Sequence, residues 1–304
     1  METILETAEL SKRYGHGYAL RDLSMQVEKG SIYGLIGRNG AGKTTLIRLI
    51  CGLQQPTAGT YRLWGVRCDN RAIAGMRRRM SAIVETPSMY AGLSAIDNIR
   101  QQYRVLGRPS MEGAEALLEL VGLPNTGRKK AASFSLGMKQ RLGIAVALAG
   151  DPDFLVLDEP TNGLDPQGII ELRELLLRLN RERAITLLIS SHNLDELSRV
   201  ATHYGFIDSG RMVREVAAEE VHAACRRRTH LTVSDAAILV RVLDKLNVEY
   251  AVTAERQADV YGDWNLTETF AALREAGCDV LSLTERSETL ESYYINLLGG
   301  EQHA

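Results

Sequence analysis

The sequence predicts an α/β fold on the strength of three apolar segments. Residues 32–36, 154–159 and 185–190 are short and apolar, as is typical of strands buried in a parallel sheet. The first runs into a glycine-rich loop, and residues 44–50 then read as a helix that ends before Gly52. The second ends in two carboxylates, and a serine and a histidine follow the third. Polar residues at the carboxyl ends of parallel strands indicate a ligand site.

The glycine-rich loop matches the phosphate-binding pattern G-x-x-x-x-G-K-[ST]. Its glycines let the backbone turn tightly and point its N–H groups inward, so that they form a nest for phosphate oxygens. The lysine reaches the β- and γ-phosphates, and the first threonine is placed to ligate Mg²⁺. The strand before and the helix behind the loop exclude a chance glycine turn, so we predict a P-loop NTPase core that binds ATP and Mg²⁺. The predicted nucleotide-binding residues are Gly37, Arg38, Asn39, Gly40, Ala41, Gly42, Lys43, Thr44 and Thr45.

Charged residues follow two of the other predicted strands. Asp158 is expected to hold Mg²⁺, and Glu159 to orient or deprotonate the attacking water. The alternative, an acidic strand end that marks the surface, is disfavoured because the phosphate loop is also present. His192 by itself reads as a structural histidine, but beside these acids it is placed to hydrogen-bond a γ-phosphate. We therefore expect Glu159, His192 and Lys43 to be catalytic.

The other segments predict three further parts. Residues 4–10 and 20–27 predict an N-terminal antiparallel sheet, because the second alternates apolar and polar residues. Tyr14 lies between these two segments. Its ring has two equally supported roles, which are to stack on a purine base or to cap the edge of the core. A strand over 81–85 ends in Glu85, and helices then extend from about residue 94 to 150 as a separate lobe.

The C-terminal part is predicted to be a second, α+β domain. Its strands and helices alternate in the order of a split β-α-β sandwich of the ferredoxin-like type. The predicted boundaries are a nucleotide-binding domain over 1–216, a linker over 217–228 and an accessory domain over 229–304. The accessory domain carries no constellation of catalytic residues, which indicates a binding, dimerising or regulatory role.

The composition excludes several classes of protein. A net charge of −2 over 304 residues argues against a nucleic-acid partner bound through a broad basic surface. Four scattered cysteines without C-x-x-C spacing predict neither a metal site nor a disulfide framework, and favour a cytoplasmic compartment. No apolar run approaches the roughly 18–20 residues that cross a bilayer, so any membrane spans are expected on another chain.

Residues 1 to about 215 resemble the ATP-binding subunits of ATP-binding cassette (ABC) transporters. Tyr14 matches the base-stacking aromatic of that family, and His192 matches its switch histidine. The phosphate loop matches the Walker A motif, the acid pair the Walker B motif, Asn162–Asp165 the D-loop and Phe134–Arg141 the signature. The resemblance implies an ATPase that acts with an integral membrane permease subunit. It places the chain in the cytoplasm, on the inner face of a bacterial plasma membrane.

The resemblance also implies a head-to-tail dimer, expected here to be a homodimer. Ser135 and Gly137 of one subunit would complete the ATP site of the other, and Asp165 of the D-loop would lie at the seam. The signature departs from L-S-G-G-Q, because Leu136 replaces its first glycine and Met138 its glutamine.

Glu85 stands where most of the family has the glutamine of the Q-loop. We expect Glu85 at the ATP site and near the metal, since Mg²⁺ between its carboxylate and the phosphates would offset their repulsion. Glutamate here is similar to the pattern of immunity and export transporters for lantibiotics and bacitracin-like peptides. The sequence thus predicts a motor that exports such a peptide antibiotic or a drug. The alternatives are a soluble ABC-type ATPase that acts on DNA or the ribosome, and a nucleotide sensor without hydrolysis.

Overall fold

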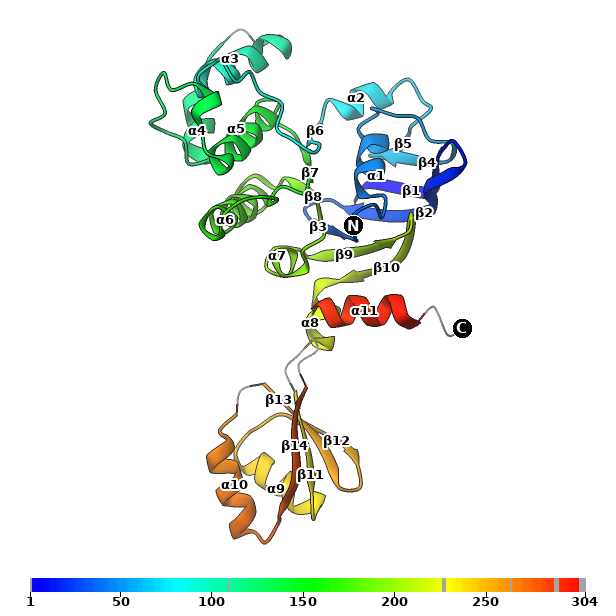
Figure 1. Ribbon diagram of the computed structural model, residues 1–304, viewed down its shortest axis with the longest axis vertical. Helices are drawn as coiled ribbons and strands as arrows, with labels where there is room; N and C mark the ends of the chain where they lie inside the picture. The colour runs from blue at the N-terminus through cyan, green and yellow to red at the C-terminus, as the bar shows by residue number, and fades with distance from the viewer. Residues whose placement is uncertain (1, 109, 226–227, 263, 287–289, 301–304) are drawn as a thin grey trace. The chain divides into compact units, whose positions relative to one another are not determined.

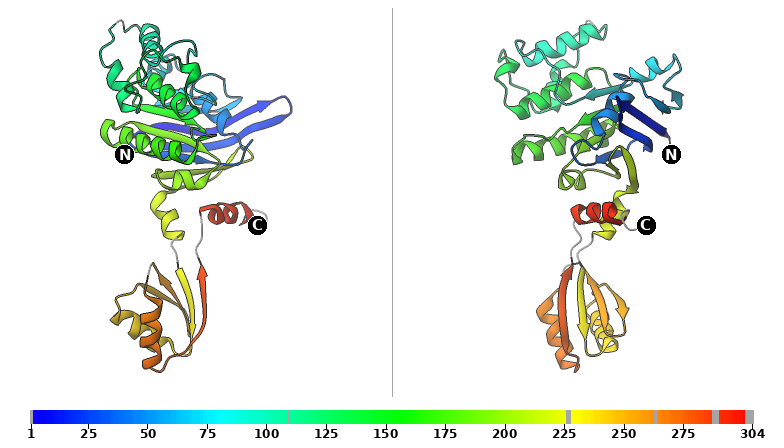
Figure 2. Two further views of the ribbon diagram at one scale, coloured as in Figure 1. Left: turned by 60° about the vertical axis from the view of Figure 1, so that its left-hand side comes forward. Right: turned by 45° about the vertical axis from the view of Figure 1, so that its right-hand side comes forward.

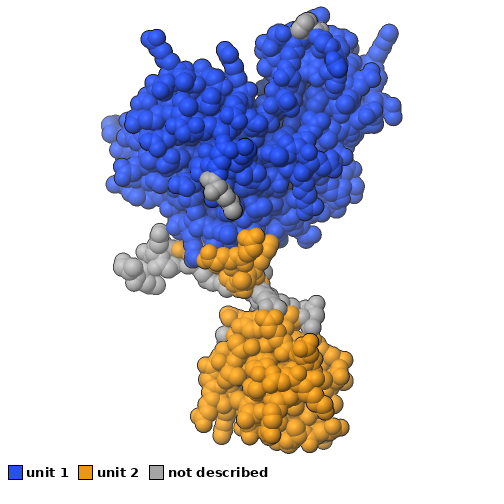
Figure 3. Space-filling model, turned by 180° about the vertical axis from the view of Figure 1, so that it is seen from behind, with its two compact units in different colours: residues 1–218 blue, residues 219–304 orange. Residues whose placement is uncertain are grey.

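The chain folds into two compact units. The computed structural model describes residues 2–108, 110–225, 228–262, 264–286 and 290–300. Figure 1 labels the elements, Figure 2 gives two further views, and Figure 3 colours the units, residues 1–218 and 219–304, separately. Within the described ranges, no helix is both long and apolar enough to cross a lipid bilayer.

The first unit contains two sheets and a group of helices. Its strands are β1 (Thr3–Tyr14), β2 (Gly17–Glu28), β3 (Ile32–Ile36), β4 (Ala58–Leu63), β5 (Val66–Arg67), β6 (Met80–Ile83), β7 (Phe154–Asp158), β8 (Thr186–Ser191), β9 (His203–Asp208) and β10 (Arg211–Ala217). Its helices are α1 (Lys43–Ile50), α2 (Ile73–Arg77), α3 (Ala95–Val105), α4 (Ala114–Leu120), the 3-10 helix η1 (Ala131–Ser133), α5 (Leu136–Leu148), α6 (Pro166–Arg183) and α7 (Leu194–Ser198).

The larger sheet has the strand order β10-β9-β3-β8-β7-β6. Strands β9, β3, β8, β7 and β6 pair in parallel, and β10 pairs antiparallel to β9. All residues of β3, β7 and β8 are buried, as their continuous apolar sequences predict for strands covered on both faces. The carboxyl ends of β3, β7 and β8 therefore meet at one edge, and the chain leaves β3 there through the glycine-rich loop.

The smaller sheet is antiparallel, with the order β2-β1-β4-β5. Leu23, Met25 and Val27 on one face of β2 are buried in a core that also contains Leu46 and Ile50 of α1. The predicted N-terminal sheet is thus confirmed. Its strands are longer than the sequence pattern indicated, because polar residues at their ends continue the β1–β2 pairing.

Helices α3, α4 and α5 gather in one lobe, set apart from β1 and β2 (Figures 1 and 2). The first of them begins as predicted, because the hydroxyl of Ser94 accepts a hydrogen bond from the backbone N–H of Asp97 at 3.2 Å. The strand before this lobe is shorter than expected. It ends at Ile83, two residues before Glu85.

The second unit contains an antiparallel sheet, and helices α9 and α10 contribute residues to its core. Its elements are α8 (Ala218–Ala224, which begins in the first unit), β11 (Arg228–Val233), α9 (Ala236–Lys245), β12 (Tyr250–Ala254), β13 (Gln257–Tyr261), α10 (Leu266–Glu275), β14 (Val280–Arg286) and α11 (Leu290–Gly300). The sheet order is β12-β13-β11-β14, and α9 lies beside α10 (Figure 2). Leu231, Leu243 and Val260 contribute to its core. Helix α8 lies within the segment predicted as a linker.

A partly buried hydrogen bond joins β3 to the edge strand β10 of the larger sheet. The hydroxyl of Tyr33 donates to Oε1 of Glu215 at 2.6 Å, beside a cavity of about 350 Å³ that both residues line. Burial raises the pKa of Glu215, and the hydrogen bond from Tyr33 opposes that rise. Burial and the neighbouring carboxylate raise the pKa of Tyr33 well above its ordinary value, so the phenol remains a donor at neutral pH.

Candidate nucleotide site

The loop between β3 and α1 has a backbone that requires glycine at particular positions. Gly42 immediately precedes α1 with φ 109°, and a Cβ added there would lie 2.6 Å from the carbonyl oxygen of Ala19. A Cβ on Gly37 would lie 2.5 Å from the carbonyl oxygen of Ile207. Side chains are excluded at both ends, so the loop stays narrow and its N–H groups remain accessible to an anion.

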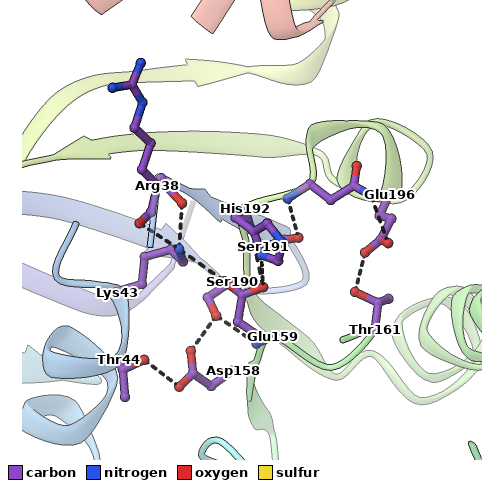
Figure 4. Close-up of polar contacts among 12 residues, drawn as sticks. Arg38, Lys43, Thr44, Asp158, Glu159, Thr161, Ser190, Ser191, His192 and Glu196 are labelled. Atoms are coloured by element: carbon purple, nitrogen blue, oxygen red, sulfur yellow. Dashed lines mark hydrogen bonds and ion pairs between the residues drawn. The ribbon is translucent and has the colours of Figure 1, made fainter. Parts of the chain in front are cut away.

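Lys43 is buried, with 5% of its side chain exposed, and its ammonium group lies within the loop (Figure 4). It donates hydrogen bonds to the carbonyl oxygens of Gly37 at 2.6 Å and Arg38 at 3.2 Å. Its Nζ also lies 3.1 Å from Oε1 of Glu159. A buried cation needs such partners, and the arrangement keeps a positive charge at the phosphate nest.

Thr44 and Asp158 come together from α1 and the end of β7. The threonine hydroxyl donates to Oδ2 of Asp158 at 2.8 Å, and the hydroxyl of Ser190 donates to Oδ1 at 2.6 Å. Ser190 reaches Asp158 because the two residues are paired in the register of β7 and β8. Both carboxylate oxygens are therefore fixed, and one of them faces the first turn of α1.

Glu159 and His192 form the second polar pair of the site. Nδ1 of His192 lies 2.7 Å from Oε2 of Glu159, while Oε1 of Glu159 faces Lys43. The backbone N–H of Glu159 donates to the hydroxyl of Ser190 at 2.9 Å, and its φ of 49° turns the chain sharply after β7. Asp158 and Glu159 thus serve different neighbours, although they are adjacent in the chain (Figure 4).

Cys51, at the end of α1, does not contribute reactive thiol chemistry. Burial is the main cause that raises its pKa to about 12, with a minor contribution from Asp158, and Arg77 opposes the rise. The thiol is protonated at neutral pH, whereas nucleophilic cysteines need the thiolate.

Two of the predicted site residues are exposed and lie outside this cluster. Tyr14 has an exposed ring, its hydroxyl bonds to Gln54, and Nζ of Lys12 lies 5.3 Å from the ring centroid. Glu85 forms an ion pair with Arg48 of α1 at 2.6 Å. Among the described contacts, Glu85 makes no hydrogen bond or ion pair with Thr44 or Asp158.

The signature and D-loop residues lie together in a second place. Ser135, Gly137 and Asp165 line a cavity of about 360 Å³ between the ends of α5 and α6. Ser135 caps α5 by accepting from the N–H of Met138 at 3.3 Å, and Asp165 caps α6 by accepting from the N–H of Gly168 at 2.9 Å. Within the described residues, no hydrogen bond or ion pair links this group to Lys43.

Sequence reasoning missed three residues around the site. The sequence pattern places Ser190 only in a core strand. Its hydroxyl in an otherwise apolar run is the one signal in the sequence that indicates a role at the site. Arg48 is the partner of Glu85, and nothing in the sequence indicates that pairing. Glu196 of α7 bonds to the hydroxyl of Thr161 and accepts from Nδ2 of Asn193 at 3.0 Å, so it joins the segments after Glu159 and His192.

Comparison with known sequences identifies similar proteins. The model of the family described as ABC transporter matches residues 20–162. The bacitracin transport ATP-binding protein BcrA of Bacillus licheniformis is 39% identical over 307 residues, which cover 99% of each chain. The lantibiotic transport ATP-binding protein SrtF of Streptococcus pyogenes is 42% identical over 70% of this chain and 90% of its own length.

Solved structures of ATP-binding cassettes share the fold. CbiO1 from Clostridium perfringens, part of the transporter complex cbiONQ, is 25% identical with a TM-score of 0.66, over 81% of this chain and 97% of its own. The cassette MJ0796, solved as a dimer in a post-hydrolysis state bound to ADP and Pi, is 22% identical with a TM-score of 0.63. It covers 71% of this chain and 99% of its own. The first unit therefore has the fold of an ATP-binding cassette.

Proposed function

The chain belongs to the ATP-binding, ATP-hydrolysing subunits of ABC transporters, and we propose that it drives the export of a peptide antibiotic of the bacitracin or lantibiotic type, or of another drug. The observation that carries this proposal is the similarity to a bacitracin transport protein over 99% of both chains, the C-terminal unit included. The lantibiotic transport relative covers 70% of the chain. This difference favours a bacitracin-like substrate.

The proposal is tested by deleting the gene in its bacterial host and measuring the inhibitory concentrations of bacitracin, a lantibiotic and an unrelated antibiotic. The deletion strain should be more sensitive to bacitracin than the parent. The wild-type gene should restore the original sensitivity, whereas the Glu159→Gln gene should not. Unchanged sensitivity to both peptides contradicts the proposed substrate class.

We propose that ATP binds at the loop Gly37–Thr44, with its triphosphate in the nest and at Lys43. The exposed ring of Tyr14 is available to stack on the adenine base. Glu159 accepts the proton of the attacking water, and His192 holds the Glu159 carboxylate in place and contacts the γ-phosphate. The 2.7 Å contact between His192 and Glu159 supports these roles.

Mg²⁺ is the metal that we propose for this site. A hydroxyl from Thr44 and a carboxylate from Asp158, 2.8 Å apart, are hard oxygen ligands of the kind that Mg²⁺ prefers. Mg²⁺ usually takes one or two protein oxygens and completes its shell with phosphates and water, so this donor set fits. When bound, the metal neutralises charge on the phosphates. Glu85 is expected from the sequence to lie near the metal, but we propose that it is not a metal ligand, because its carboxylate pairs with Arg48 at 2.6 Å.

We propose that two copies of the chain form a head-to-tail dimer on binding ATP. Ser135, Gly137 and Asp165 lie together around one cavity, and they contact the nucleotide of the second copy. The 3.3 Å cap at Ser135 places its hydroxyl at the N-terminus of α5, which suits a phosphate. Sedimentation with and without ATP tests this state, and a monomer at every ATP concentration contradicts it.

The membrane spans are proposed to come from a separate permease subunit, which holds the chain at the inner face of the plasma membrane. We propose domain boundaries of 1–216, 217–228 and 229–304, which the division of the chain after residue 218 supports. The sheet order β12-β13-β11-β14 with two helices supports a ferredoxin-like C-terminal domain. Co-purification with an integral membrane protein, rather than with ribosomes or DNA, tests the permease assignment.

A further inference from the structure

Glu85 lies two residues beyond the end of β6, and its carboxylate is bound by a residue of the P-loop helix. Oε1 of Glu85 lies 2.6 Å from Nη2 of Arg48, with side-chain exposures of 60% and 35%. The ion pair therefore joins two segments that are 37 residues apart in the chain. The guanidinium of an arginine is permanently charged, so the Glu85 carboxylate lies against a fixed positive charge.

The backbone at Glu85 is strained. Its φ is 62°, and the N–H of Thr86 donates to the carbonyl oxygen of Val84 at 2.8 Å, which closes a three-residue turn around Glu85. Such a turn with positive φ is rare and costly for a residue other than glycine. A strained turn persists when other contacts fix it, and the ion pair to Arg48 is such a contact.

The position of Arg48 connects this turn to the nucleotide site. Arg48 follows Thr44 by four residues in α1, so the two side chains lie on the same face of the helix. Thr44 in turn bonds to Asp158. The guanidinium neutralises Glu85 on this face, which removes the need for a metal ion to offset its negative charge near the phosphates.

We infer that Arg48 is the positioning residue of Glu85, and that their ion pair anchors the turn after β6 to the P-loop helix. The role of this anchoring in catalysis rests on the proposed function, but the anchoring itself is a property of the nucleotide-free chain.

Hydrogen exchange of the full-length, nucleotide-free chain tests the anchoring. The peptide that contains Thr86 is followed by mass spectrometry in Arg48→Ala, Glu85→Ala and the double variant. Each single variant should exchange about twofold to fivefold faster in this peptide, as expected for a largely exposed ion pair, and the double variant no faster than either. Arg67→Ala, which removes another exposed ion pair, to Asp69, is the matched control and should leave the peptide unchanged. Unchanged exchange in Arg48→Ala, or additive effects in the double variant, overturns the inference.

Two further measurements distinguish anchoring by the ion pair from a general loss of packing and from metal ligation by Glu85. Arg48→Lys and the reversal Arg48→Glu with Glu85→Arg should restore slow exchange, whereas loss of a packing contact would not be restored. Mn²⁺ with ATP, observed by electron paramagnetic resonance, should bind Glu85→Ala and wild type within about twofold. A loss of about tenfold in Glu85→Ala alone would make Glu85 a metal ligand and overturn the inference. If wild type binds no ATP, the proposed function fails while the exchange result stands.

Discussion

The ammonium of Lys43 lies 3.1 Å from the carboxylate of Glu159, so the binding lysine and the proposed base neutralise each other. A triphosphate that enters the nest competes with Glu159 for Lys43. The carboxylate is then free to accept a proton from water, and it keeps its contact with His192. The ion pair thus holds Glu159 in place before the nucleotide arrives.

Glu159→Gln should abolish turnover and strengthen ATP binding. The amide cannot accept the proton of water, so hydrolysis should fall about 10²–10⁴-fold. The variant also removes a negative charge that competes with the phosphates for Lys43. Phosphate release and binding of a fluorescent ATP analogue measure the two effects. Turnover within about twofold of wild type would refute the assignment of the base.

Ser190→Ala should weaken both the stability of the first unit and its catalysis. The hydroxyl is buried and donates to Oδ1 of Asp158, which loses this donor in the variant. The N–H of Glu159 loses its 2.9 Å bond to the hydroxyl and keeps only its 3.2 Å bond to the carbonyl oxygen of residue 190. We expect a loss of about 1–3 kcal/mol in the free energy of unfolding. Urea denaturation measures it, with the exposed Ser88→Ala as control. Equal stability of the two variants would contradict the role of Ser190.

Alanine at Gly42 should impair ATP binding much more than alanine at Gly40. Both glycines have positive φ, 109° and 83°, but a Cβ meets no atom within 4 Å at Gly40 and lies 2.6 Å from the backbone of Ala19 at Gly42. Gly40→Ala should cost only the conformational penalty of about 1–2 kcal/mol. Titration of an ATP analogue should show affinity at least about tenfold lower for Gly42→Ala than for Gly40→Ala.

Glu215→Gln should change how the stability of the first unit depends on pH. Burial raises the pKa of Glu215 in the folded state, so the unfolded chain ionises first as the pH rises through the ordinary value of 4.5. Wild type therefore loses stability relative to the variant from that pH upward, until the folded carboxyl has also ionised.

Urea denaturation over this pH range measures the difference between wild type and Glu215→Gln. Trp264→Phe in both backgrounds leaves Trp64, which packs against the core of the first unit, as the fluorescent reporter. If the free energy of unfolding of wild type instead increased with pH relative to that of Glu215→Gln, the predicted direction of the pH dependence would be wrong.

The sequence was sufficient to predict the strands that carry the site, for identifiable physical reasons. The apolar runs before Gly37, Asp158 and Ser191 are long enough only for buried strands, and parallel strands end at one edge. Motif spacing then placed Lys43 and Glu159 together.

The remaining contacts depend on tertiary structure. Ser190 reaches Asp158 only through the register of two strands that are far apart in the chain, and local pattern does not determine register. Arg48 and Glu85 are 37 residues apart in the chain, so their contact also depends on the tertiary fold. The same limit applies to α8, which is too short to show a clear helical period.

The pairing of Asp158 with Ser190 has a consequence for how the chain folds. A slip of one residue between β7 and β8, in the direction that places Ile189 beside Asp158, would turn every side chain of the slipped strand to the opposite face. A chain with that error has no second hydroxyl on the carboxylate and cannot hold the nucleotide in the same way. ATP therefore selects the correctly paired molecules, and by binding only these it shifts the folding equilibrium toward them.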